Sequence, residues 1–101
     1  MNKKSSIDVL RKEMEDTTIE IMRLVGKRLS LAKKIGETKL QEGLPIEDLE
    51  VERRLRTTVA ETCKAYGVDL NFGLRLLNLL VEEAKGVQNK RTKKRLRKKG
   101  C

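Results

Sequence analysis

One helical pattern runs through the first 40 residues of the chain without interruption. From Ile7 to Thr38, mostly apolar residues recur at alternating spacings of three and four, the period of one helix face, and no proline intervenes before Pro45. With Ser5 as a hydroxyl cap, the pattern predicts a first helix of about 35 residues, roughly 50 Å long. A chain of 101 residues cannot cover so long a helix with its own side chains. We therefore expect a second copy of the chain to cover part of it.

Turn and capping residues predict two further helices. Gly43-Leu44-Pro45 marks a turn, after which a second helix begins at residues 46–48 and ends at Gly67. Asp69 can cap a third helix that continues to Gln88. The whole chain has one proline and two aromatic residues, too few for the strands and turns of a sheet protein. We therefore predict an all-α fold with three helices per chain, one of them very long.

The positive charge of the chain is concentrated at its C-terminal end. The net charge is +9, and residues 89–101 hold eight lysines and arginines and no acid, which leaves +1 for residues 1–88. We therefore predict a helical domain over residues 1–88. Residues 89–101, the basic tail, are predicted to be a flexible, solvated extension.

Composition also limits the chemistry that the chain can perform. Its lack of histidine removes the commonest general acid, general base and metal ligand. Cys63 and Cys101 have neither metal-site nor disulfide-framework spacing, and we expect both to be reduced thiols. We find no run of about 18 apolar residues and no signal peptide, so we expect a soluble cytoplasmic protein without a membrane partner.

Several polar residues occupy positions where a helical bundle would place apolar ones. Arg28 is the clearest, because it lies in the middle of the first helix between Leu24 and Leu31. The other three are Asp48, Glu52 and Gln88. Burying an unpaired charge is costly, so Arg28 either pairs with one of the two acids or faces a ligand. The pattern alone leaves both interpretations open.

Two more cations relate to Arg28 by helical geometry. Lys39 follows it by eleven residues, which returns to within about 20° of the same face, so both can face one space. Arg11 precedes Arg28 by seventeen residues, about 25 Å along the axis, too far to share a small ligand within one chain. Arg11 can take part only from a partner subunit. Considered singly, Lys39 and Arg11 also fit ordinary surface positions.

An ordered set of short segments carries a family resemblance over residues 7–88. The set comprises Ile7-Asp8-Val9-Leu10-Arg11, Val25-Gly26-Lys27-Arg28 with Leu31-Ala32, Ile35-Gly36-Glu37-Thr38-Lys39, Pro45-Ile46-Glu47-Asp48 with Glu52-Arg53, and Val81-Glu82-Glu83 leading to Gln88. With these segments the chain resembles the all-helical chorismate mutases of the shikimate pathway. The resemblance implies an isomerase of aromatic amino acid biosynthesis that converts chorismate to prephenate without cofactor or metal. It also implies an intertwined dimeric helical bundle with shared active sites.

The resemblance further implies a role for each unusual polar residue. Arg28 and Lys39 would bind substrate carboxylates, and Arg11 would complete this clamp from the partner subunit. Lys39 and Gln88 would donate hydrogen bonds to the ether oxygen of the breaking bond. Glu52, with Asp48 beside it, would hold the ring hydroxyl.

The sequence departs from the family pattern at two pocket positions. Val51 stands where many members have an arginine, and Ala84 where some have a serine. Both usual residues give secondary contacts to a carboxylate, so their loss bears on affinity and efficiency more than on reaction type. Lys85 and Arg53 are nearby cations that could compensate.

Two other functions fit parts of the sequence. An isochorismate-pyruvate lyase would use the same scaffold and cationic clamp, but Asp48 and Glu52 favour the mutase. A basic helical nucleic-acid-binding protein is suggested by the basic tail, whose cations could neutralise several phosphates. That tail lacks aromatic residues for stacking on bases, and residues 1–88 are almost neutral. We therefore do not expect nucleic acid to be a partner.

Overall fold

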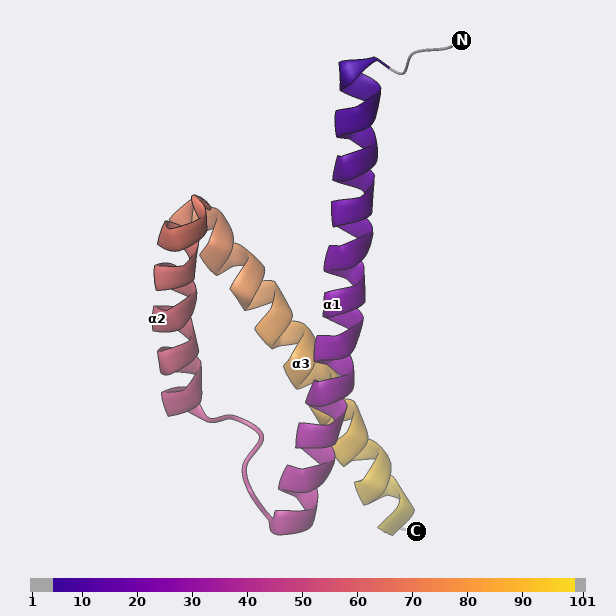
Figure 1. Cartoon of the computed structure of the whole chain (residues 1–101). Helices are drawn as coiled ribbons and strands as arrows, with labels where there is room; N and C mark the ends of the chain where they lie inside the picture. The colour runs from indigo at the N-terminus through magenta and orange to yellow at the C-terminus, as the bar shows by residue number, and fades with distance from the viewer. Residues whose placement is uncertain (1–4, 100–101) are drawn as a thin grey trace.

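The chain forms three helices and, over the residues described, no strand (Figure 1). This computed structural model describes the backbone of residues 5–99 and the side chains of residues 5–89. The helices are α1 (Ser6–Glu42), α2 (Leu49–Tyr66) and α3 (Leu70–Lys99). The predicted all-α fold with one very long helix is confirmed, although α2 begins one residue after the predicted span.

Capping residues explain where the helices begin and end, and Ser5, Asp69 and Gly67 among them are predicted from the sequence. Ser5, Asp48 and Asp69 each accept a hydrogen bond through the side chain from the backbone N–H three residues later, at 3.2, 3.2 and 2.9 Å. Each cap thereby satisfies a backbone donor that the first helical turn leaves unpaired. Gly43 and Gly67 end α1 and α2 in the left-handed conformation, with φ of 70° and 68°, which glycine adopts without strain.

Helix α3 is the element that holds the other two together. It packs against the C-terminal half of α1 and along α2, whereas no close backbone approach joins α1 and α2 in the described region. In Figure 1, α2 and α3 form an open V, and α3 crosses the lower part of α1. The N-terminal half of α1 stands apart from both.

The isolated chain is far more extended than a compact domain of its length. Its radius of gyration is 18.8 Å, against about 13 Å for a compact domain of about 100 residues. In the described part, the buried apolar side chains are those of Ala32, Cys63 and Leu77, and none of the large side chains is completely buried. One copy of the chain therefore has almost no core of its own.

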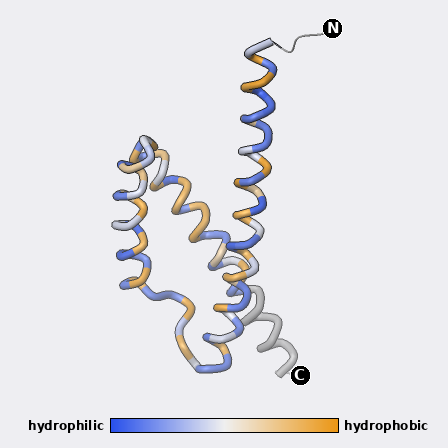
Figure 2. Tube along the Cα trace, viewed as in Figure 1, coloured by the Kyte–Doolittle hydropathy of each residue, from blue (hydrophilic) through white to orange (hydrophobic). Residues whose placement is uncertain are grey.

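The exposed half of α1 carries the apolar residues that such a core would need. Figure 2 shows apolar turns recurring along this half of the helix. Large apolar residues on one side of this half are between 48% and 69% exposed: Ile7, Leu10, Met14, Ile21, Met22 and Leu24. We call them the α1 stripe. A stripe of this length is unusual on the surface of a monomeric protein, where large apolar patches mark interaction sites.

The basic tail begins inside α3, which continues as a helix to Lys99. The predicted boundary between residues 88 and 89 therefore does not coincide with a helix end. The flexibility of the tail stays a prediction; its side chains beyond Asn89, and Cys101, lie outside the described residues. No described helix is long and apolar enough to cross a membrane.

Candidate functional site

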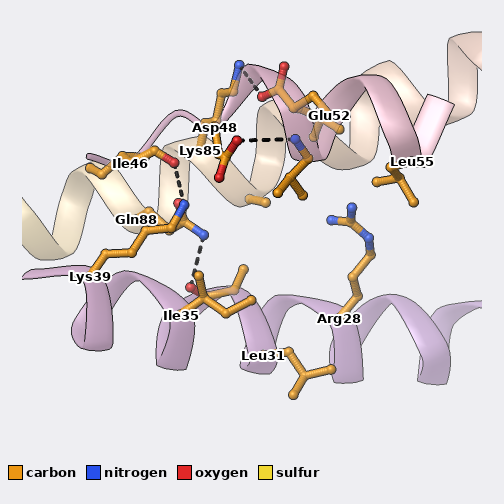
Figure 3. A pocket seen from close by; sticks show the side chains of 14 residues that line it. Arg28, Leu31, Ile35, Lys39, Ile46, Asp48, Glu52, Leu55, Lys85 and Gln88 are labelled. Carbon is orange, nitrogen blue, oxygen red and sulfur yellow. Dashed lines mark hydrogen bonds and ion pairs between the residues drawn. The ribbon is translucent and has the colours of Figure 1, made fainter. Parts of the chain in front are cut away.

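The unusual polar residues gather around one pocket where all three helices contribute side chains (Figure 3). Its volume is about 490 Å³, within the range of about 300–1,000 Å³ that is typical of small-molecule sites. Seven of the eight predicted site residues line it: Arg28, Lys39, Asp48, Val51, Glu52, Ala84 and Gln88. Apolar side chains from each helix complete the wall. The pocket can therefore hold a small molecule between charged groups on an apolar surface.

Arg28 projects from α1 into this space and is held by the backbone of α3. Its Nη1 donates a hydrogen bond to the carbonyl oxygen of Leu80 at 3.0 Å. Among the described residues, no ion pair joins Arg28 to Asp48 or Glu52. A guanidinium has five N–H donors, so the bond to Leu80 fixes the side chain and leaves other donors for a ligand. This arrangement favours the ligand-facing interpretation of Arg28.

Lys39 lies near the C-terminal end of α1 and reaches the connection between α1 and α2. Its Nζ donates to the carbonyl oxygen of Ile46 at 2.6 Å. An ammonium has three donors, so this bond orients Lys39 without exhausting its capacity. Arg28 and Lys39 line the same pocket, as their spacing on the helix predicts.

Gln88 lies where α3 crosses α1 and is only 7% exposed. Its Nε2 donates to the carbonyl oxygen of Ala32 at 3.3 Å. The crossing is close at Gly36, where an added Cβ would meet Gln88 Cγ at 2.9 Å. The absence of a side chain at Gly36 therefore allows Gln88 to occupy its place against α1.

The two acids of the pocket lie at the N-terminal end of α2, where Asp48 is the cap and Glu52 lies in the first turn. Asp48 caps the helix through Oδ1, which accepts from Val51 N at 3.2 Å. Glu52, one turn later, pairs through Oε1 with Lys85 Nζ of α3 at 2.9 Å. The two acids thus lie side by side at the pocket, as Figure 3 shows.

Lys85 is a third cation that lines the pocket, and the sequence alone assigned it no definite role. Besides Glu52, its Nζ contacts Glu47 Oε1, also at 2.9 Å. Hydrogen bonds to Glu52 first and Glu47 second raise the pKa of the Lys85 ammonium above its usual range. Lys85 lies four residues after Val81 and three before Gln88 on one helix face, a spacing that could have marked it as a pocket residue.

The two other cations considered from the sequence lie outside the pocket. Arg53 is exposed, pairs with Glu50 of its own helix at 3.4 Å and does not line the pocket. The Arg11 side chain is 75% exposed on the free half of α1, with its Nη1 3.9 Å from Asp8 Oδ1. Its participation from a partner subunit stays a prediction.

Comparison with known proteins gives one consistent family. The family model described as chorismate mutase type II matches residues 10–89. The chorismate mutase of Methanocaldococcus jannaschii is 35% identical over 79 residues, which cover 78% of this chain and 80% of that protein. A bifunctional chorismate mutase/prephenate dehydratase of Escherichia coli is 26% identical over 84 residues, 83% of this chain but 22% of its own length. The chain thus spans less than a quarter of that bifunctional relative.

Structural comparison leads to the same group. The solution structure titled monomeric chorismate mutase from Methanococcus jannaschii superposes with a TM-score of 0.67 at 29% identity. The match covers 91% of this chain and 96% of that one. The three-helix arrangement described above is therefore shared over almost the whole of both chains.

The close contact at Gly36 gives a first prediction. We expect Gly36→Ala to lower the free energy of unfolding by about 1–3 kcal/mol, the usual cost of overpacking, because the new methyl group displaces Gln88. Gly86→Ala is the matched control, since an added Cβ there meets nothing within 4 Å. Urea unfolding at one fixed protein concentration measures both variants. A Gly36→Ala protein as stable as Gly86→Ala would contradict the close packing.

Proposed function

The chain belongs to the chorismate mutase type II family, and we propose that the pocket between its three helices is the active site. The activity is that of a chorismate mutase, the isomerisation of chorismate to prephenate. In this reaction a C–O bond breaks while a C–C bond forms within one molecule. No proton has to move, so catalysis consists of holding a compact pose and stabilising charge on the ether oxygen.

The observation that carries this proposal is the convergence of Arg28, Lys39 and Gln88 on one pocket. Arg28 and Lys39 would bind the carboxylates of the substrate, since both are cations with donors to spare. Both are already oriented by backbone carbonyls, at Leu80 and Ile46. The cost of ordering these side chains is thereby met during folding, which favours binding.

Lys39 and Gln88 would act on the ether oxygen. Negative charge grows on this oxygen as the C–O bond breaks, so donors aimed at it bind the transition state more strongly than the substrate. The low exposure of Gln88 strengthens such a hydrogen bond, because little water competes with it. These two residues are therefore proposed as the main contributors to the rate.

The acids at the start of α2 would recognise the ring hydroxyl. Glu52 and Asp48 line the pocket and can accept a hydrogen bond from a hydroxyl group. Val51 and Ala84 also line it and offer apolar contact alone, so we expect weaker carboxylate binding than in relatives with polar groups there.

The relatives reported above are named chorismate mutases, alone or fused to a prephenate dehydratase, and give no support to the lyase or nucleic-acid alternatives.

The active enzyme is proposed to be a homodimer that shares its active sites. The α1 stripe and the near absence of a core in one copy support this assembly. Arg11 lies on the same half of α1 as the stripe, so a helix packed over the partner's pocket could bring it there. A third cation from the partner would then help to enclose a substrate that carries two negative charges.

Removal of the proposed donors tests the assignment of the active site. We expect Lys39→Ala and Gln88→Leu each to lower kcat by at least about tenfold, since loss of one donor to a developing oxyanion costs on the order of 100-fold. Arg28→Ala should be at least as damaging. The measurement is the steady-state loss of chorismate and formation of prephenate. Arg53→Ala, an exposed cation outside the pocket, is the control and should stay near wild type; unchanged turnover in Lys39→Ala or Gln88→Leu would remove that residue from the mechanism.

Subunit mixing tests the contribution of Arg11 from the partner. Arg11→Ala and Arg28→Ala homodimers should both be nearly inactive, because every site lacks one cation. In a mixed dimer with two-fold symmetry, one site loses both cations and the other keeps both, so random mixing should restore about a quarter of wild-type activity. Activity is assayed before and after unfolding and refolding the two variants together. No gain on mixing would mean that Arg11 and Arg28 act within one chain or that Arg11 is dispensable.

A further inference from the structure

Lys85 lines the pocket and contacts two acids, Glu47 just before α2 and Glu52 in its first turn. The proposed function gives Lys85 no role. Its Nζ lies 2.9 Å from Glu52 Oε1 and 2.9 Å from Glu47 Oε1. We propose that Lys85 is a positioning residue that holds the Glu52 carboxylate in place to accept the ring hydroxyl of the substrate. This inference rests on the proposed function of the pocket.

Lys85 already has two acidic partners in the structure. Its ammonium donates a hydrogen bond to Glu47 Oε1, in the segment before α2, and forms an ion pair with Glu52 Oε1 of α2. Its single positive charge is more than balanced by the charges of Glu47 and Glu52. A cation neutralised in this way is a poor free ligand for a substrate carboxylate, whereas Arg28 is held by an uncharged carbonyl. Lys85 is therefore suited to act through Glu52 and not directly on the substrate.

The carboxylate of Glu52 is held through one of its two oxygens. In the described structure its Oε1 is engaged by Lys85, and no hydrogen bond is formed by its Oε2. A carboxylate fixed through one oxygen presents the other in a defined direction, which suits the recognition of a hydroxyl group. Figure 3 shows the Lys85 ammonium beside the Glu52 carboxylate, next to Asp48 at the same edge of the pocket.

Lys85 also helps to place the first turn of α2. Helices α1 and α2 have no close backbone approach to each other in the described region, so the first turn of α2 depends on α3 and on the connecting segment. Lys85 joins α3 to that turn through Glu52 and to the connection through Glu47. The same side chain thus fixes both the direction of the carboxylate and the placement of the turn that carries it.

The charge of Lys85 also matters for an anionic substrate. Residues 47–52 contain four acids, of which Glu50 pairs with Arg53. The other three, Glu47, Asp48 and Glu52, would together repel a dianion. The raised pKa of Lys85 keeps this side chain positively charged at neutral and moderately alkaline pH, so the acids are partly balanced there. The balance would be lost only as the pH rises through that raised pKa.

Kinetics of four proteins test the proposal. They are the wild type, Lys85→Met, Glu52→Gln and the double variant. A contact to the ring hydroxyl exists in substrate and transition state alike, so its loss raises KM more than it lowers kcat. We expect Lys85→Met to raise KM by about tenfold with a smaller change in kcat, and to add less than about twofold in the Glu52→Gln background. Lys85→Arg, which keeps the charge, should recover most of the loss.

Controls separate this role from a general loss of charge. Lys64→Met removes an exposed lysine of α2 outside the pocket and should leave KM unchanged. If Lys85→Met raised KM by the same factor in the wild-type and Glu52→Gln backgrounds, the proposal would be overturned in favour of direct contact between Lys85 and the substrate. If the Lys85→Met variant had the KM of the wild type, Lys85 would have no role in substrate binding. Urea unfolding of the same four proteins measures the coupling between Lys85 and Glu52 without substrate. If the wild type did not convert chorismate, the proposed function would fail, while a coupling of zero would refute the Lys85 contact independently.

Discussion

A helix of 37 residues that its own chain leaves half uncovered is the constraint on which the rest of the structure depends. Only the C-terminal half of α1 is packed by α3, and the α1 stripe remains exposed. Water contact with so many large apolar side chains is unfavourable, at about 25 cal/mol for each Å² left exposed. A second copy would remove this cost and would bring a new helix near each pocket. Folding, assembly and catalysis are then linked through one helix in the proposed dimer.

The pocket combines this architecture with side chains that are oriented before substrate arrives. Arg28, Lys39 and Gln88 each donate to a backbone carbonyl of another segment of the chain, so the crossing of α1 and α3 and the connection to α2 fix their positions. A reaction without proton transfer needs such fixed donors more than it needs a titrating group. In the proposed mechanism, catalysis therefore needs no histidine.

Much of the fold and most of the pocket were predictable because their signals are local. Ser5, Asp69 and Gly67 mark helix ends through interactions within four residues, and the structure confirms all three. Arg28 could be recognised because a charge interrupted an apolar helix face. The carbonyl partners of Arg28 and Gln88 could not be predicted, because they depend on how α1 and α3 cross, and that of Lys39 depends on the path of the connection to α2. The bridge from Lys85 to Glu47 and Glu52 joins residues 33 or more positions apart and was missed for the same reason. The continuation of α3 to Lys99 could not be predicted, because a run of lysines and arginines is compatible with a helix as well as with a solvated extension.

The mass of the folded protein in solution tests the central claim most directly. Sedimentation equilibrium at micromolar concentration should give twice the chain mass of 11.6 kDa, with the helical content of the structure retained. A folded species of 11.6 kDa that converts chorismate at the full rate would contradict the account, because one chain would then suffice to cover α1 and to complete the active site.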